Sequence, residues 1–290
     1  MCLFAPLAIK NMAYKGILIP IGGNEDKGSG NQDDGFDFIT EGILSQVVAE
    51  SGGLNASILV ITTASRIPVE VGENYIKAFN LLACTNVEIL DIRTREDMEQ
   101  KALLEKVKKA DCIMFTGGDQ SRIVDIIGGT EMHHILKHRF QNEQIVIAGT
   151  SAGAMAMSSE MISGGSSSEA LLKGSVDMRD GMNFIPGLII DSHFIKRGRF
   201  GRLTESVAKF PHLLGVGLAE DTGMIIRNCN HFTIIGSGMV IIFDPSSLSH
   251  NNVEILPQGT PMTLTDLTVH VLANGDSFKI DEKKIRVSDD

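Results

Sequence analysis

A serine stands in a turn of the kind that presents a catalytic nucleophile. Residues 149–153 read Gly-Thr-Ser-Ala-Gly, which matches G-x-S-x-G, and they follow an apolar run at 145–148. The glycines permit a sharp turn that would hold Ser151 in an unfavourable backbone conformation with its hydroxyl above a sheet. The N–H of Ala152 could then donate to a developing oxyanion. This pattern predicts a serine hydrolase with Ser151 as nucleophile.

A serine nucleophile needs a base, and His193 is the best placed of the eight histidines. It follows an apolar run at 187–191, so it would emerge at the edge of the sheet where Ser151 lies, whereas the others lie in ordinary helix, turn or strand contexts. Spacing alone does not choose the carboxylate that orients the imidazole. The candidates are Glu220, which lies between two predicted strands, and Asp191, Asp221 and Glu169.

A cationic segment adjoins this histidine. Four cations lie within seven residues of an otherwise acidic protein, namely Lys196, Arg197, Arg199 and Arg202. Arginine forks beside a catalytic histidine suit a carboxylate of a substrate or product. The segment therefore indicates a carboxylate-bearing peptide as substrate.

The elements that position these residues alternate between strand and helix. Apolar runs predict strands at 17–21, 58–63, 87–92, 112–115 and 145–148, and helical spacing predicts helices at 38–49, 95–109, 121–127 and 131–140. This alternation predicts an α/β fold with a mostly parallel sheet covered by helices on both faces. Functional groups are then expected beyond the carboxyl ends of the strands.

The last third of the chain has a different pattern. Closely spaced runs at 215–218, 223–227, 232–235 and 240–243 predict antiparallel additions to the same sheet. Residues 267–280 surround Asn274-Gly275, which favours a type I′ turn and predicts a hairpin within 260–290. With no repeat or linker in view, residues 1–290 are interpreted as one domain whose residues 1–13 are frayed.

Composition narrows the classes of partner. A formal net charge of −10 argues against binding to nucleic acid or to an anionic membrane. No apolar stretch reaches the roughly 18 residues that would span a bilayer. The cysteines, Cys2, Cys84, Cys112 and Cys229, show no metal-ligand spacing and indicate a reduced, cytoplasmic protein.

Four segments in this order, at 115–120, 149–153, 191–202 and 220–222, resemble the serine peptidase family that contains the cyanophycinases and the α-aspartyl dipeptidases. The resemblance implies a three-layer fold like that of class I glutamine amidotransferases (flavodoxin-like), with serine in place of their cysteine. It implies an exopeptidase that hydrolyses cyanophycin, an aspartate backbone carrying arginine on each side-chain carboxyl, to β-aspartyl-arginine. It favours a homodimer and implies no metal or organic cofactor.

The same resemblance assigns roles to single residues. Ser151 would be the nucleophile, His193 the base and then the acid, and Glu220 the orienting carboxylate, with Gly118 and Ala152 supplying the oxyanion hole. The predicted substrate-binding residues are Asp119, Gln120, Glu169, Asp191, Ser192, Arg197, Arg199 and Arg202. Of these, Asp191 and Glu169 would hold the arginine side chain, and Ser192 stands where the family usually has Gln.

Three alternatives are weighed against this prediction. The first is a peptidase for other acidic or β-aspartyl peptides. The second is an esterase of the α/β-hydrolase type that uses Ser151, Asp244 and His270. The third is a non-catalytic peptide-binding relative. A nucleotide site at Gly22-Gly23-Asn24-Glu25-Asp26-Lys27 is set aside, because G-x-G-x-x-G is absent, and these residues are interpreted as a loop that lines the site.

Overall fold

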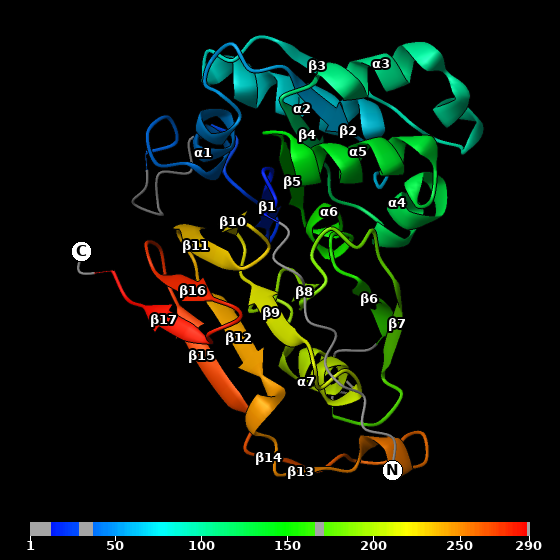
Figure 1. Cartoon of the computed structure of the whole chain (residues 1–290), viewed down its shortest axis with the longest axis vertical. Helices are drawn as coiled ribbons and strands as arrows, with labels where there is room; N and C mark the ends of the chain where they lie inside the picture. The colour runs from blue at the N-terminus through cyan, green and yellow to red at the C-terminus, as the bar shows by residue number, and fades with distance from the viewer. Residues whose placement is uncertain (1–12, 29–36, 166–170, 289–290) are drawn as a thin grey trace.

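The computed structural model describes residues 13–28, 37–165 and 171–288 (Figure 1). The predictions for Glu169, for Cys2 and for a frayed N-terminus up to residue 12 concern residues outside these ranges. Cys84, Cys112 and Cys229 are free, and the first two are buried.

In the described chain the larger sheet has nine strands, in the order β17-β16-β11-β10-β1-β5-β4-β2-β3. These are β1 (Ile17–Ile21), β2 (Ile58–Ile61), β3 (Val87–Leu90), β4 (Cys112–Phe115), β5 (Val146–Thr150), β10 (Thr222–Arg227), β11 (His231–Gly236), β16 (Ser277–Lys279) and β17 (Lys284–Arg286). Strands β1, β5, β4, β2 and β3 pair in parallel, and the other four pair antiparallel. The predicted α/β fold with a parallel central sheet is confirmed.

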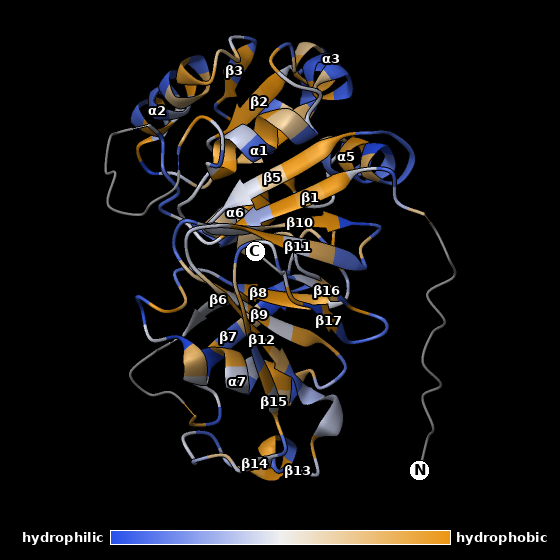
Figure 2. Cartoon of the chain, turned by 90° about the vertical axis from the view of Figure 1, so that its left-hand side faces the viewer, coloured by the Kyte–Doolittle hydropathy of each residue, from blue (hydrophilic) through white to orange (hydrophobic). Residues whose placement is uncertain are grey.

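Helices cover both faces of the parallel strands. The helices are α1 (Ile43–Glu50), α2 (Pro68–Leu81), α3 (Lys101–Lys109), α4 (Gln120–Ile127), α5 (Glu131–Asn142), α6 (Ala152–Met155) and α7 (Phe200–Lys209). Val60 packs in one apolar cluster with Phe79 of α2, whereas its neighbour Leu59 belongs to the other cluster, with Leu136 of α5. Alternate side chains of a strand point to opposite faces, so both faces are buried. Figure 2 shows the resulting hydrophobic strands β1 and β5 between helices of mixed character.

A second sheet lies below the parallel strands of the first in Figure 1, and its order is β15-β12-β9-β8. It consists of β8 (Leu188–Asp191), β9 (Leu214–Leu218), β12 (Val240–Asp244) and β15 (Thr268–Leu272). The prediction that the runs at 215–218 and 240–243 extend the first sheet is therefore wrong. Strands β8, β9 and β12 are buried along their whole length, and a fully apolar run carries no information about which sheet it joins.

The predicted hairpin over 267–280 does not form. Strand β15 pairs with β12 in the second sheet, whereas β16 pairs with β11 in the first, so the turn at Asn274-Gly275 connects two sheets. The antiparallel pair in this region is β16 with β17. Turn chemistry predicted the reversal of the chain but not the partner of each strand.

Two predicted helices are shorter than expected. Residues 38–42 form turns, because the Asp37 carboxylate accepts the N–H groups of Ile39 and Thr40, and α1 begins only at Ile43. The helix predicted over 95–109 is divided at Gln100, whose backbone is extended, into a 3₁₀ helix (Glu96–Glu99) and α3.

Smaller elements complete the second half of the chain. Strands β6 (Glu160–Gly165) and β7 (Val176–Asp180) pair with each other, as do β13 (His250–Asn251) and β14 (Leu264–Thr265). Two 3₁₀ turns lie at Pro245–Ser247 and Val253–Ile255. No helix among the described residues has the length and apolar character needed to cross a membrane.

Candidate active site

Ser151 occupies the sharp turn that its surroundings predict. Strand β5 ends at Thr150 and α6 begins at Ala152, which leaves Ser151 alone between them with φ 50° and ψ −106°. Few non-glycine residues adopt this conformation, and its cost is tolerated where the surroundings fix it. The N–H of Ser151 donates to the carbonyl of Ile21 at 2.8 Å. The end of β1 thus fixes the turn that exposes the hydroxyl.

His193 meets Ser151 from the other sheet. Nε2 of His193 lies 3.0 Å from Oγ of Ser151. His193 follows β8 of the second sheet, whereas Ser151 follows β5 of the first, so the expectation that both emerge from one sheet is wrong. The chain after β1 bridges the two, because the N–H of His193 donates to the carbonyl of Gly22 at 2.8 Å. The site therefore lies where the carboxyl end of β5 in the first sheet meets the carboxyl end of β8 in the second.

Glu220 is the carboxylate that contacts the imidazole. It lies between β9 and β10, and its Oε1 is 2.7 Å from Nδ1 of His193, while Lys196 holds Oε2 at 3.0 Å. Of its competitors, Asp221 accepts from Asp26 N–H and Ser237 instead. An ionised carboxylate only accepts hydrogen bonds, so Nδ1 donates and Nε2 is left to accept from the serine hydroxyl.

The two ionisable groups have shifted pKa values. Burial lowers the pKa of His193 below its ordinary value, although the hydrogen bond with Glu220 acts in the opposite direction. Burial raises the pKa of Glu220, but the hydrogen bonds from His193 and Lys196 outweigh this effect and leave it lowered. At neutral pH the pair consists of a neutral imidazole and a carboxylate, which is the state a general base requires.

The two residues predicted to form the oxyanion hole, Ala152 and Gly118, lie in the segments that adjoin Ser151. Ala152 is the first residue of α6, where helical N–H groups have no partner within the helix. The loop after β4 contacts Ser151, because a Cβ on Gly117 would be 3.5 Å from Cβ of Ser151. At Gly118, with φ +142°, a Cβ would come within 2.1 Å of the carbonyl oxygen of Ala64, so only glycine fits.

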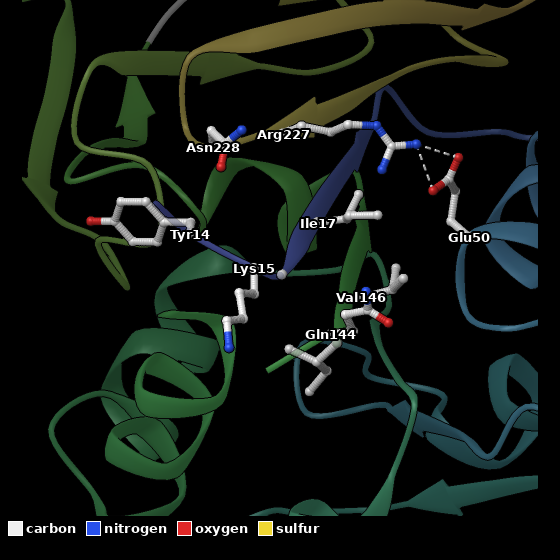
Figure 3. A pocket seen from close by; sticks show the side chains of 10 residues that line it. Tyr14, Lys15, Ile17, Glu50, Gln144, Val146, Arg227 and Asn228 are labelled. Atoms are coloured by element: carbon white, nitrogen blue, oxygen red, sulfur yellow. Dashed lines mark hydrogen bonds and ion pairs between the residues drawn. The ribbon is translucent and has the colours of Figure 1, made fainter. Parts of the chain in front are cut away.

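A pocket of about 450 Å³ opens beside these groups. Its lining consists of Gly23, Asn24, Glu25, Lys27, Val71, Asn74, Tyr75, Gly117, Gly118, Thr150, Ser151, His193 and Arg197. Among the predicted substrate-binding residues that the structure describes, Arg197 alone lines it. A second pocket lies at the amino ends of β1 and β5, where Arg227 pairs with Glu50 (Figure 3). None of the predicted site residues lines that pocket.

Asp191 does not line the pocket that contains Ser151. Its side chain is fully buried, and Arg199 and Arg202 hold its two oxygens at 3.0 and 2.9 Å. Arg199 also donates to the carbonyl of Ser192 at 2.6 Å. The prediction that Asp191 holds the arginine side chain of a substrate disagrees with this burial. Asp191, Arg199 and Arg202 form a buried ion cluster, which holds the two residues before His193 in place.

The remaining predicted pocket residues are engaged within the protein. Ser192 is 1% exposed, and its Oγ lies 3.3 Å from Sδ of Met155 and 3.5 Å from Oγ of Ser151. Gln120 donates to the carbonyl of Ile162 at 2.9 Å, and the carboxylate of Asp119 caps α4 through the N–H of Ser121.

The alternative esterase triad is not assembled. His270 lies in β15 with its ring centre 6.2 Å from that of Phe278, and Asp244 pairs with Lys283 at 2.6 Å. The partner of Ser151 is His193. Among the described residues no cluster of His, Cys, Asp and Glu could hold a metal ion.

The loop at 22–27 lines the pocket as predicted, through Gly23, Asn24, Glu25 and Lys27, but sequence reasoning missed the hydrogen-bonded group around Glu25. Glu25 accepts hydrogen bonds from Lys27, Tyr75 and Thr150, the residue before the nucleophile. The polar run directly after β1 could have indicated Glu25 and Lys27. Strand β1 pairs in parallel with β5, so the residues after β1 emerge beside Ser151. Nothing in the helical pattern of α2 distinguishes Tyr75.

Comparison with known proteins adds independent findings. Residues 28–234 match peptidase family S51. The chain is 36% identical to a cyanophycinase of Nostoc sp. over 94% of its length and 88% of the relative's, and 34% identical to one of Geminocystis herdmanii over 90% and 92%. A solved peptidase of an acI-B1 Actinobacterium has the same fold, with a TM-score of 0.64 at 20% identity over 93% of this chain and 98% of that one.

Proposed function

This chain belongs to peptidase family S51, and from that membership we propose that it is a serine exopeptidase that hydrolyses cyanophycin to β-aspartyl-arginine dipeptides. Relatives named cyanophycinase align with nine tenths or more of its length, including those of Nostoc sp. and Geminocystis herdmanii. The observation that carries the proposal is the row of hydrogen bonds from Glu220 through His193 to Ser151 at the edge of the pocket.

The reaction begins with activation of the serine. Nε2 of His193 takes the proton of the Ser151 hydroxyl as Oγ attacks a carbonyl carbon of the aspartate backbone. The imidazolium that forms is stabilised by Glu220, which also keeps the ring in the tautomer that leaves Nε2 free to accept. The burial that lowers the pKa of His193 keeps this base unprotonated near neutral pH.

The negative charge then passes to the carbonyl oxygen. The N–H groups of Gly118 and Ala152 would donate to this oxyanion from fixed backbone positions, which need no reorganisation as the charge develops. His193 returns its proton to the leaving amine, the peptide bond breaks, and an acyl-enzyme on Ser151 remains. A water molecule deprotonated by His193 attacks the ester, and the released serine recovers the proton.

Charge at the pocket supports a carboxylate-bearing substrate. Each unit of the polymer carries a free carboxylate and a guanidinium, because arginine is joined through its amino group. Lys196 and Arg199 are paired with Glu220 and Asp191. Arg197 lines the pocket, is exposed, and has no ion-pair partner among the described residues. We assign it to a substrate carboxylate.

The proposal includes the setting in which the enzyme works. We infer a cytoplasmic homodimer, on the grounds of the acidic charge, the free buried Cys84 and Cys112 and the family membership. We also treat the two sheets as one domain, because one apolar cluster contains Leu59 of the first and Val216 of the second. Light scattering after size-exclusion chromatography tests the dimer.

The activity test uses three substrates. Purified protein is incubated with insoluble cyanophycin, plain polyaspartate and β-Asp-Arg, and the products are identified by mass spectrometry. Release of β-Asp-Arg from cyanophycin alone is expected, together with its loss in Ser151→Ala. Cleavage of other acidic or β-aspartyl peptides but not of cyanophycin would reject the substrate and retain the peptidase. A folded protein that cleaves none of them and does not react with a fluorophosphonate probe would be a binding protein.

A further inference from the structure

A buried acid lies behind the nucleophile and takes no part in the mechanism above. The carboxylate of Glu25 is 1% exposed and accepts hydrogen bonds from Lys27 at 2.8 Å, from Thr150 at 2.5 Å and from the hydroxyl of Tyr75. Although burial opposes ionisation, the attraction and hydrogen bond of Lys27 and the other donors leave its pKa lowered. Glu25 is thus a fixed negative charge whose counter-ion is Lys27.

Lys27 lines the same pocket as Ser151 and Arg197. Its ammonium bonds to the carboxylate of Glu25 at 2.8 Å and to the Glu25 carbonyl at 3.3 Å, and it lies 4.9 Å from the centre of the Tyr75 ring. An ammonium has three N–H donors, so these contacts leave one for a ligand. The side chain is 29% exposed, which means that it is held on the pocket wall but not sealed from it.

The charges that line the pocket determine which ligand group the remaining N–H of Lys27 can bind. Glu25 and Lys27 neutralise each other, so Arg197 leaves the lining of the pocket with an excess of positive charge. A guanidinium would be repelled by this excess charge, whereas a carboxylate gains a charge-assisted hydrogen bond from the remaining N–H of Lys27. We propose that Lys27 is a specificity-determining residue that binds a free carboxylate of the arginine-bearing substrate, and that Glu25 is the positioning residue that holds Lys27 against the pocket.

This inference rests on the proposed function for its substrate and is tested with dimers of β-Asp-Arg. Such a dimer has three free carboxylates, one on each arginine and one at the end of the backbone, and each is converted in turn to an amide. In the wild-type protein one of these amides is expected to raise KM roughly tenfold, as loss of one charged hydrogen bond would, with kcat nearly unchanged. The amide that does so identifies the subsite.

The decisive variant removes the pair together. Lys27→Met alone would leave Glu25 buried and unpaired, which destabilises a fold. Glu25→Gln combined with Lys27→Met removes both charges, and the Gln amide offers its oxygen to one of the hydroxyls of Thr150 and Tyr75 and an N–H to the other. In this double variant the amide and the carboxylate should have the same KM. Lys27→Arg should retain the difference, and so should Lys77→Met, which removes an exposed lysine of α2 outside the pocket.

Binding measurements separate this inference from the proposed function. Calorimetry compares β-Asp-Arg with forms in which each carboxylate is an amide, on the wild type and the double variant. A preference for the carboxylate that the double variant loses supports the role of Lys27, even if the wild type cleaves no dimer and the proposed function is rejected. A preference that the double variant keeps, or no preference at all, overturns it. So does a loss of affinity only when the guanidinium is replaced by a neutral urea.

Discussion

The imidazole of His193 lies directly against Gly23. A Cβ built on Gly23, where φ is +101°, would come within 2.5 Å of both Cε1 and Nε2 of the ring. The carbonyl of the preceding residue, Gly22, accepts the N–H of His193. The turn after β1 therefore fixes the backbone position of His193 and limits how its ring can be placed against Ser151.

Gly23→Ala should consequently disable the enzyme without unfolding it. The new methyl group must push the ring away from Oγ of Ser151, and a misplacement of about 1 Å costs roughly 100-fold in rate. The measurement is kcat on soluble β-Asp-Arg dimers, together with the unfolding midpoint in urea.

Gly52→Ala is the matched control for that substitution. Gly52 has nearly the same backbone conformation, with φ +103°, but a Cβ there has no atom within 4 Å. It shares the strain of an L-residue at positive φ and lacks the clash with His193. Equal losses of kcat in the two variants would show that strain, and not displacement of the imidazole, explains the effect.

Sequence patterns predicted the parts of this site that are local in the chain. The Ser151 turn could be predicted because an apolar run, two glycines and a serine are adjacent, and His193 because it follows such a run. The loop that contains Glu25 was predicted to line the site, but the buried contacts of Glu25 were not, since its partners Tyr75 and Thr150 lie 50 and 125 residues away. Adjacency in the chain misled at Asp191, where arginines of the following segment fold back and bury the carboxylate.

The assignment of strands to two sheets was also beyond the sequence. A run that is apolar on both faces fits any fully buried strand, so β9 gave no sign that it pairs with β8 and not with β10. The pairing of these strands also affects the site, because the sheet that contains β8 determines from which side His193 approaches Ser151. Local sequence patterns were enough to identify Ser151 and His193, but the pairing of strands determines how these two residues meet.

Glu220→Gln should reduce kcat severely while KM changes little. The amide can still contact Nδ1, but it removes the charge that stabilises the imidazolium and permits the wrong tautomer, which in a serine protease triad costs about 10⁴-fold. His270→Ala serves as the control, since that ring packs near Phe278 and should be dispensable. If His270→Ala abolished hydrolysis while Glu220→Gln did not, the assignment of both residues would be wrong.

The rate should depend on pH through His193. The base is active when neutral, and burial holds its pKa below the ordinary value of 6.5, so kcat/KM should rise with pH and reach its plateau at or below neutrality. The charge of Arg197 contributes to this lowering. Arg197→Gln should therefore raise the pKa of His193 and move the acid limb to higher pH.

Profiles of kcat/KM against pH at constant ionic strength test that shift, with Lys77→Gln as a charge control outside the pocket. Loss of Arg197 also weakens substrate binding in our proposal, but that changes the height of the profile and not its midpoint. A midpoint that moves to lower pH, or that moves equally in the control, would contradict the assignment.

Asp191→Asn should destabilise the fold without altering substrate recognition in the molecules that remain folded. Asp191 is fully buried between Arg199 and Arg202, and removing its charge leaves two guanidinium groups in a poorly solvated site at a cost of about 3–5 kcal/mol. Asp125→Asn, which breaks an exposed pair with Arg179, should change stability little. Urea unfolding measures both, and KM is compared below the transition. If Asp191 contacted the arginine of the substrate, the outcome would be reversed, with a raised KM and an unchanged unfolding midpoint. The two roles are separable because an ion cluster acts on the whole fold, whereas a substrate contact acts only when the substrate is bound.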